Sequence, residues 1–504
     1  MNRYGIDGGE SGETVLAALV KQGAVLSAPC GGRGLCGKCR VKLIEGRVRE
    51  LETAGRTSGE ENAAEGGIVS GGLIPACKTV PLGGILVELL PETFDGNEVD
   101  GGCLDPEFLS AAAGSPRRAG AALDIGTTTL SAQAVDLDTG QVIAVHSCLN
   151  GQKLFGADVM SRISAAREGK TGELFRLIND QTEELLHLFM ERCGLSSIET
   201  LAVSGNTAML HLFVNEDPSG LGEVPFTPVF LESRDYAGAE LGLSAGRVRL
   251  LPSISSFVGS DITAGLAALD IFRREDGTFL VDIGTNGEMA LLRGGGLLCC
   301  STAAGPCFEG AEISCGMGAV RGAIDRVAMK DGRLSFTTIG GAKPRGICGC
   351  GLIDAAALML KTGVIDETGA FAGGRGGFPL APGIALTQGD IRQFQLAKSA
   401  ILSGVRILCR RGGMEPGDLA GLFIAGGFGF FIGQENAITA GVLPDIPRER
   451  IAVCGNLSLK GAVQSLTDRS FFPRCEEIAA KSQTIDLAAD PAFMDEFAEN
   501  MIFP

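Results

Sequence analysis

The chain has 504 residues, a net charge of −17 at pH 7 and an apolar content of 45%. The length predicts about two to four domains with real cores, and the negative charge excludes a duplex nucleic-acid or anionic-membrane surface, which needs clustered Lys and Arg. The polar start predicts no secretory signal, and the longest apolar run, Gly421 to Gly433, is too short to span a bilayer. Sixteen cysteines without an export signal predict a reducing, cytoplasmic location rather than a disulfide scaffold.

The first predicted elements surround a cysteine loop. Apolar residues recur at helical spacing between Gly12 and Gly23, and Val41 and Leu43 alternate with charged residues as in a half-buried strand. We expect a loop from Thr53 to Gly72 and a closing strand that ends near residue 91. Only about ten residues precede the helix, so we expect the opening strand to be truncated or missing.

The cysteine loop reads CGGRGLCGKC, with five and then two residues between its thiols, and another cysteine follows in LIPACKTV. Thiolates hold iron-sulfur clusters, and this spacing resembles that of vertebrate-type [2Fe-2S] ferredoxins. The glycines allow the backbone N–H groups to turn toward the sulfurs. The alternative is a zinc knuckle, but zinc sites more often pair two CxxC units. The sequence therefore predicts a [2Fe-2S] cluster held by Cys30, Cys36, Cys39 and Cys77.

A linker and a larger module follow the cysteine loop. The stretch from Glu92 to Arg118 is aperiodic and rich in Gly, Ala and Pro, as linkers are. A strand then ends at Asp124, and a Gly/Thr turn leads into a second strand over Leu130 to Val135. The same plan recurs around Asp282 in TFLVDIGTNGEMALLRGGG, which predicts two lobes of one topology. A long amphipathic helix at Asp390 to Arg410 leads into the strand LFIAGGFG.

Each of the two turns combines a carboxylate, backbone N–H groups and a hydroxyl on one short arc. The N–H groups and the hydroxyl suit phosphate oxygens, while the carboxylate suits Mg²⁺, usually through water. One Asp-x-Gly turn is more often a plain hairpin, but two copies in equivalent positions favour a shared binding site. Gly426 and Gly427 would leave room for a flat base or ribose against the backbone.

These turns also carry a resemblance to a known group of proteins. DIGTTT, DIGTNGE and AGGFG resemble the phosphate-1, phosphate-2 and adenosine motifs of the acetate/sugar kinase, Hsp70 and actin superfamily of ATPases. With a [2Fe-2S] head in front, the chain resembles the reductive activators of corrinoid proteins, and GADVMSRI, VSGNTAML and GICGCGLIDA are also similar to that family. Cys307 and Cys350 depart from the Ala and Ser expected there.

The resemblance implies an α/β multidomain fold. We expect a ubiquitin-like [2Fe-2S] ferredoxin domain at 1–91, a linker at 92–118, and two RNase H-like lobes of the ATPase superfamily at 119–272 and 273–504.

The resemblance also implies the function. Activators of this kind use ATP to return a corrinoid protein of a methyltransferase system from inactive Co(II) to Co(I). The implied cofactors are the [2Fe-2S] cluster, ATP and Mg²⁺, and the implied partners are the corrinoid protein, an external low-potential electron donor and a second copy of the chain. The alternative is a ferredoxin-type electron carrier or redox sensor whose second module binds nucleotide without hydrolysing it.

The roles of individual residues follow partly from this chemistry and partly from the resemblance. Asp124 and Asp282 would hold Mg²⁺, and either Asp261 or Glu288 would orient the attacking water. The residues expected to surround the nucleotide are Asp124, Gly126, Thr127, Thr128, Asp282, Gly284, Thr285, Asn286, Gly426 and Gly427.

Other residues that can bind metals are interpreted differently. Cys348 and Cys350 are the place to look for a second metal site, but free Cys is common in Gly/Ala-rich cores and no CxxC accompanies them. His146, His187 and His211 are scattered, and we expect each to be a packed or surface residue.

Overall fold

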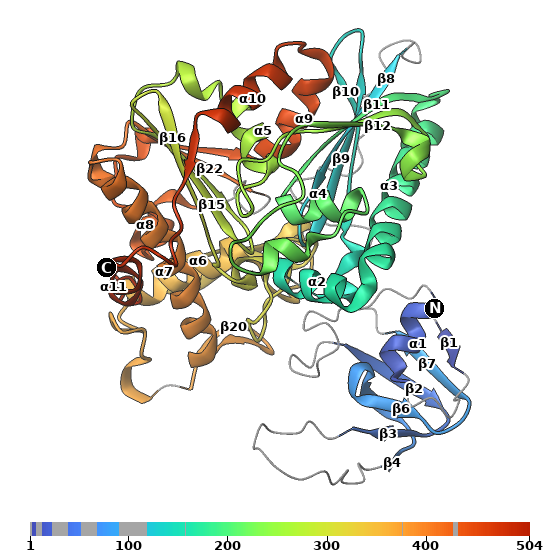
Figure 1. Cartoon of the computed structure of the whole chain (residues 1–504). Helices are drawn as coiled ribbons and strands as arrows, with labels where there is room; N and C mark the ends of the chain where they lie inside the picture. Colours follow the sequence, from blue (N-terminus) through green and yellow to red (C-terminus); the bar gives the residue numbers. More distant parts are fainter. Residues whose placement is uncertain are drawn as a thin grey trace.

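The computed structural model describes residues 3–6, 13–22, 39–51, 68–89, 118–156, 158–374, 376–426 and 432–504. Figure 1 shows a small N-terminal unit and two large sheets with helices packed around them. The predicted linker at 92–118 lies outside the described residues, apart from Arg118. None of the described helices is long and apolar enough to cross a membrane.

The N-terminal unit contains two small sheets and one helix among the described residues. Its elements are β1 (Arg3–Ile6), α1 (Val15–Lys21), β2 (Arg40–Glu45), β3 (Val48–Glu50), β4 (Ile68–Val69), β5 (Gly72–Pro75), β6 (Thr79–Pro81) and β7 (Ile85–Leu89). The sheets have the orders β1-β7-β2-β5 and β4-β3-β6. The predicted helix is confirmed as α1, and the predicted alternation is confirmed because Val41 and Leu43 are buried while Arg40 and Lys42 are exposed.

Two predictions for this unit need correction. The opening strand is present: β1 pairs antiparallel with β7, and Ile6 is buried in the core of the unit. Four residues are enough because β1 is an edge strand, which pairs on one side with a sheet formed by residues further along the chain. The expected loop over 53–72 also contains the short strand β4, which pairs with β3, while residues 52–67 lie outside the described residues.

The first large sheet has six strands within the described residues. They are β8 (Ala119–Ile125), β9 (Thr129–Asp136), β10 (Val142–Leu149), β11 (Ile198–Gly205), β12 (Arg234–Ala237) and β13 (Ala245–Leu250), in the order β10-β9-β8-β11-β13-β12. Its helices are α2 (Val159–Ala165), α3 (Thr171–Cys193), α4 (Thr207–Phe213) and α5 (Ser260–Ala268). Gly194, with φ of 65°, ends α3 in the left-handed conformation that glycine favours.

The second large sheet also has six strands in the described part of the chain. They are β14 (Thr278–Ile283), β15 (Gly287–Arg293), β16 (Gly296–Thr302), β22 (Gly421–Ala425), β23 (Ile451–Gly455) and β24 (Ser482–Thr484), in the order β23-β22-β14-β15-β16-β24. Its helices are α6 (Gly349–Lys361), α7 (Gln388–Arg411), α8 (Gln434–Thr439), α9 (Leu457–Thr467), α10 (Phe471–Ala480) and α11 (Phe493–Glu499). Two small additions are β17 (Ala323–Lys330) with β18 (Arg333–Thr338) and β19 (Gly346–Ile347), and the hairpin β20 (Phe378–Ala381) with β21 (Ile384–Leu386).

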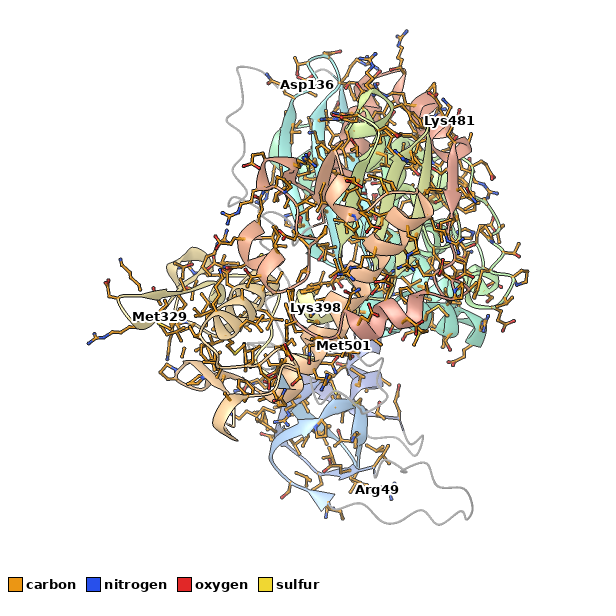
Figure 2. The ribbon with its side chains drawn as sticks, turned by 90° about the vertical axis from the view of Figure 1, so that its left-hand side faces the viewer. Arg49, Asp136, Met329, Lys398, Lys481 and Met501 are labelled. Atoms are coloured by element: carbon orange, nitrogen blue, oxygen red, sulfur yellow. The ribbon has the colours of Figure 1, made fainter. Side chains whose placement is uncertain are left out.

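The long helix α7 matches its predicted stripe. Thr387 and Asp390 cap its start reciprocally, and the apolar residues of the predicted face are buried. The same helix holds the C-terminal segment, because Lys398 Nζ donates to the carbonyls of Asn500 (2.5 Å) and Ile502 (2.8 Å). Figure 2 shows Lys398 and Met501 together where the two segments meet.

The predicted duplication is confirmed by the strand orders. The first sheet contains β10-β9-β8-β11-β13 and the second contains β16-β15-β14-β22-β23, so the third, second, first, fourth and fifth strands of each repeat lie in the same sequence. Helices α5 and α9 follow the fifth strand of each repeat. Both helices contribute to one core that also takes Ala122 and Ala202 from the first sheet and Leu280 and Ala290 from the second. This shared core brings the two repeats together.

Candidate functional site

The first turn joins β8 to β9. Asp124 lies near the end of β8, and the N–H of Gly126 donates to the carbonyl of Thr129 (2.9 Å), which closes the turn. A Cβ on Gly126 would lie 2.7 Å from that carbonyl oxygen, so only glycine fits. Thr127 and Thr128 occupy the bend between the strands.

The second turn joins β14 to β15 in the same way. Asp282 lies opposite Glu288 in this hairpin. The N–H of Gly284 donates to the carbonyl of Asn286 (3.0 Å), and the carbonyl of Thr285 accepts from Gly305 N–H (2.9 Å). The Thr285 hydroxyl is buried without a hydrogen-bond partner. A buried hydroxyl of this kind is available to a ligand oxygen.

Asp124 is held from the opposite repeat. Ser458 Oγ donates to one carboxylate oxygen of Asp124 (2.6 Å), and Asn456 Nδ2 donates to the other (2.7 Å). Asn456 also caps α9, because its Oδ1 accepts from Leu459 N–H (2.8 Å). The Ser458 hydroxyl lies 2.8 Å from that of Ser204, at the end region of β11. Helix α9 of the second repeat therefore fixes the carboxylate of the first turn.

Four predicted acidic residues lie close enough to influence one another. Asp261 is in the first turn of α5. Burial, then the charge of Asp124, raise its pKa to about 7. Burial, then the charges of Asp261 and Asp124, raise the pKa of Asp282 to about 8. Burial, then the charges of Asp261 and Asp282, raise the pKa of Glu288 well above its usual value. A hydrogen bond from the Asn286 side chain acts in the opposite direction. The structure thus brings together the carboxylates that the sequence analysis placed around one site.

The pKa of Asp124 is also set by burial and by hydrogen bonds that act against each other. Burial raises its pKa, and the hydrogen bonds from Ser458 and Asn456 act in the opposite direction. Carboxylates crowded in a region of low dielectric repel one another, and a divalent cation would relieve that repulsion. Within the described residues, no three His, Cys, Asp or Glu side chains converge closely enough to hold a metal ion directly. Carboxylate oxygens suit Mg²⁺, which usually keeps several of its waters in proteins.

Glu309 joins the two turns and was not predicted. It ends a short 3-10 helix, Pro306–Glu309. One of its carboxylate oxygens accepts from the Thr128 hydroxyl, and the other accepts from the backbone N–H of Thr285 (3.1 Å). Glu309 lies in the segment STAAGPCFEGAEISCGM, where nothing in the spacing distinguishes it from Glu312.

The first turn is also supported from behind. Asn206 Nδ2 donates to Thr127 Oγ1 (3.2 Å), while its Oδ1 caps α4. Arg162 is fully buried, and its guanidinium donates to the carbonyls of Thr127 and Gly156 (3.1 Å). Asn206 and Asn456 could have been found from the sequence, because each follows a glycine at the end of a strand and precedes a helix.

The third predicted element is Gly426, just after β22. Its φ of 101° favours glycine, and a Cβ there would lie 2.6 Å from the carbonyl oxygen of Ile283 and 2.7 Å from Asp282 Oδ1. The backbone therefore passes directly against the second turn. Gly427 lies outside the described residues.

The described half of the predicted cluster site is compact. Cys39 Sγ lies 3.1 Å from Cys77 Sγ, and both residues are buried. Two adjacent buried thiols fit a [2Fe-2S] cluster as its ligands. Cys30 and Cys36 lie outside the described residues.

Cys348 and Cys350, the other candidate ligands, lie in one small buried cluster. Cys348 and Cys350 are buried with Ala323. Within the described part of the chain, no third His, Cys, Asp or Glu side chain joins them with metal-binding geometry.

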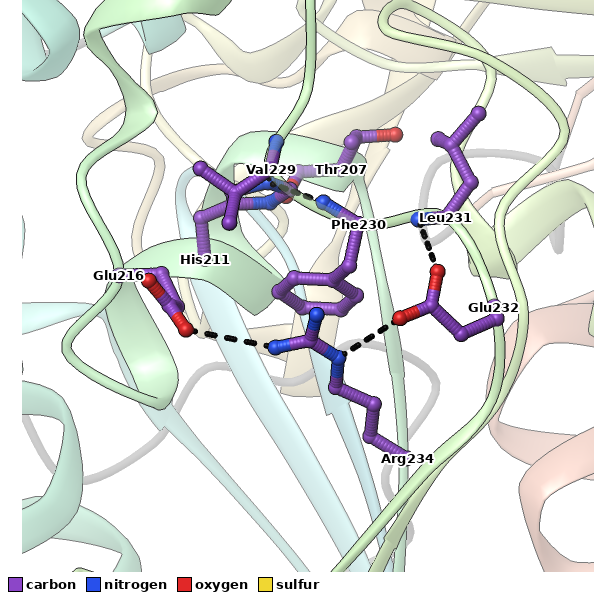
Figure 3. A network of polar contacts seen from close by, with 8 residues as sticks. All are labelled: Thr207, His211, Glu216, Val229, Phe230, Leu231, Glu232 and Arg234. Atoms are coloured by element: carbon purple, nitrogen blue, oxygen red, sulfur yellow. Dashed lines mark hydrogen bonds and ion pairs between the residues drawn. The ribbon is translucent and has the colours of Figure 1, made fainter.

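Figure 3 shows that His211 is a packed residue, as expected. Its Nδ1 lies 2.7 Å from the carbonyl oxygen of Thr207, and its Nε2 accepts from Val229 N–H (3.0 Å). Its ring stacks on Phe230 at 4.3 Å, and Arg234 covers the same phenyl ring.

Three family models match the chain. A 2Fe-2S iron-sulfur cluster binding domain matches residues 6–82, a RACo middle region matches 119–274, and the C-terminal domain of RACo, described as the ASKHA domain, matches 276–504.

Similar proteins agree with these models. The chain is 33% identical over 418 residues to the corrinoid activation enzyme RamQ of Eubacterium limosum, covering 76% of this chain and 70% of that one. It is 29% identical over 397 residues to the [Co(II) methylated amine-specific corrinoid protein] reductase of Methanosarcina barkeri, covering 72% of each. A solved structure named as a reductive activator for corrinoid, iron-sulfur protein superimposes with a TM-score of 0.72 at 29% identity, over 99% of this chain and 98% of the other.

Proposed function

This chain belongs to the RACo family of reductive activators of corrinoid proteins, and from that premise we propose that it reduces inactive Co(II) corrinoid to Co(I) in an ATP-dependent reaction. The observation that carries the ATP-dependent part is the pair Asp124 and Asp282. They lie at equivalent positions of two repeats and are electrostatically coupled. A domain that had lost nucleotide chemistry would gain nothing from burying both charges.

The two turns would hold the phosphates from opposite sides. Asp124 and Asp282 would hold Mg²⁺ through water, with Ser458 and Asn456 fixing the orientation of Asp124. The first turn offers Gly126, Thr127 and Thr128, and the second offers Gly284, Thr285 and Asn286. The unpartnered Thr285 hydroxyl is a donor suited to a phosphate oxygen.

Two carboxylates remain candidates for orienting the attacking water. Asp261 begins α5 and is coupled to both Asp124 and Asp282. Glu288 lies opposite Asp282 in the hairpin and already accepts a hydrogen bond from Asn286. Asp261 Oδ1 also accepts a hydrogen bond, from Ile262 N–H (2.8 Å), so these contacts do not rank the two, and we propose that one of them orients the attacking water.

Cys30, Cys36, Cys39 and Cys77 would hold the cluster. A [2Fe-2S] cluster supplies a one-electron couple at about −400 mV, and we expect Co(II)/Co(I) couples to lie lower. Each ~100 mV of uphill transfer costs about 2.3 kcal/mol. Binding or turnover of ATP would offset this cost if it changes the affinity of the activator for one state of the corrinoid protein.

The remaining roles are part of the same proposal. The partner is a corrinoid protein of a methyltransferase system, and an external low-potential donor reduces the cluster. The chain acts as a homodimer in the cytoplasm. The domains divide near residues 91, 118 and 272.

ATP hydrolysis distinguishes the proposal from an electron carrier whose second module only binds nucleotide. We expect the full chain to hydrolyse MgATP and Asp282→Ala to abolish hydrolysis while the EPR signal of the reduced cluster stays intact. A wild-type chain that binds MgATP without hydrolysing it would favour the electron carrier. Loss of the EPR signal together with hydrolysis would mean that the two functions are not located in separate parts of the chain.

A further inference from the structure

Glu309 occupies an unusual position between the two turns. Its carboxylate accepts from the Thr128 hydroxyl of the first turn and from the Thr285 backbone N–H of the second, the latter over 3.1 Å. Thr128 and Glu309 are 181 residues apart in sequence. A Cβ on Gly284 would lie 3.6 Å from the Glu309 carboxylate, so the side chain also lies along the backbone of the second turn.

These donors are the groups that our proposed function assigns to phosphate. A carboxylate and a phosphate are both anionic acceptors, and hydroxyl and backbone N–H groups bind either one with charge-assisted hydrogen bonds. The Thr128 hydroxyl has a single proton to donate, as has the Thr285 N–H. Neither donor can serve both anions fully, and two anions in this buried region would repel each other.

We propose that Glu309 is a latch that imitates a phosphate and that the phosphates of the nucleotide must displace it. The inference rests on the proposed function, because it assumes that nucleotide binds between these turns. Glu309 is then a positioning residue: its contacts join the first repeat to the second, and nucleotide exchanges that direct link for a phosphate bridge. Opening the latch therefore reduces the net binding free energy of the nucleotide.

Lys153 and Arg162 are cations whose pKa values the charge of Glu309 affects in the position that the structure shows. Burial lowers the pKa of Lys153, and the negative charge of Glu309 opposes that shift, so the ammonium group and the carboxylate interact.

The test is isothermal titration calorimetry of the full chain with MgADP, a non-hydrolysable MgATP analogue and adenosine. Calorimetry suits this chain, which has no Trp to report binding by fluorescence. We expect Glu309→Gln to bind both phosphate-bearing ligands on the order of tenfold more tightly than wild type, because a neutral amide competes less well for the two donors. The affinity for adenosine should not change, since adenosine carries no phosphate.

Two variants separate the latch from a general structural effect. Glu312→Gln removes an exposed charge from the same segment and should leave all three affinities unchanged. Glu309→Asp keeps the charge but is one methylene shorter, so it should tighten phosphate-dependent binding less than Glu309→Gln does. If the glutamine variant folds poorly, Glu309→Asp replaces it in the test. Equal or weaker binding of MgADP by both Glu309 variants would overturn the latch while leaving the proposed function intact. A wild-type chain that binds neither phosphate-bearing ligand would overturn the proposed function and the latch with it.

Discussion

Ser458 donates a hydrogen bond to the carboxylate of Asp124 over 2.6 Å, although 334 residues separate them. Asp124 lies near the end of β8, the first strand of one repeat, and Ser458 lies in the first turn of α9 in the other. Asn456 holds the second carboxylate oxygen from the same helix start. The orientation of a carboxylate that we expect to hold Mg²⁺ thus depends on how the two repeats pack.

The first prediction concerns this contact. Ser458→Ala should weaken MgATP binding by about tenfold and lower the free energy of unfolding by about 1–2 kcal/mol, because Asp124 loses a hydrogen bond to its charged form. The pKa of Asp124, which burial already raises, should rise further, so the acidic limb of the ATPase pH profile should move to higher pH. Titration calorimetry, denaturant unfolding and a pH-rate profile measure the three effects. Ser465→Ala removes a buried hydroxyl of the same helix that donates to the carbonyl of Ala462 in that helix (2.7 Å), and it should spare nucleotide binding. Equal effects of the two variants would contradict a specific role for Ser458.

The second prediction tests the approach of β22 to the second turn. Gly426→Ala places a methyl group 2.6 Å from the Ile283 carbonyl oxygen and 2.7 Å from Asp282 Oδ1, at a φ of 101°. We expect a loss of about 2 kcal/mol or more of stability and no measurable MgATP hydrolysis. Gly417→Ala, where nothing lies within 4 Å of the added Cβ, is the matched control. Thermal unfolding and phosphate release are the measurements, and an active, stable Gly426→Ala protein would show that the backbone does not pass so close to Asp282.

The third prediction concerns pH. The pKa of Asp282 is raised from 3.8 to about 8 and that of Asp261 from 3.8 to about 7, first by burial and then by neighbouring carboxylates. A carboxyl with a raised pKa in the folded state binds protons more tightly than in the unfolded chain, so stability falls as pH rises from about 4 to 8. In EDTA, the unfolding temperature should therefore drop between pH 6 and pH 8.5, and Mg²⁺ with ADP should reduce the drop.

Asp282→Asn is the control for this pH effect. It should flatten the decline and stabilise the metal-free protein at pH 8.5, because it removes one of the crowded charges. Parallel unfolding curves for wild type and variant across this pH range would show that Asp282 is not the source of the slope.

The fourth prediction separates the cluster from the nucleotide site. Cys77→Ser should abolish the [2Fe-2S] EPR signal and visible absorption while MgADP affinity stays within about twofold of wild type, because a hydroxyl is a poor substitute for a thiolate ligand. Cys193→Ser, at the end of α3, is the matched thiol control and should keep the signal. An intact cluster in Cys77→Ser would remove Cys77 from the ligand set.

The repeated architecture was predictable because both copies keep a strand, a Gly-rich turn and a second strand around Asp124 and Asp282. Asp261 was also predictable as a candidate, because phosphoryl transfer calls for a carboxylate that orients the attacking water. Ser458 and Glu309 were not, since each acts through contacts between segments 181 or more residues apart. The residues around one position in the sequence do not indicate which distant segment they will contact. The opening strand β1 was missed for a related reason: four residues give too short an alternation to indicate a strand, and its pairing with β7 supplies the stability.

The most direct measurement of the central proposal is anaerobic reduction of a Co(II) corrinoid protein of a methyltransferase system, followed by the absorbance of Co(I). The chain is first reduced at its cluster and then mixed with the corrinoid protein with or without MgATP. We predict that Co(I) forms only with MgATP, and that neither Asp282→Ala nor Cys77→Ser supports its formation. Co(I) formation at equal rate and yield without nucleotide, or none with MgATP present, would contradict ATP-dependent corrinoid reduction by this chain.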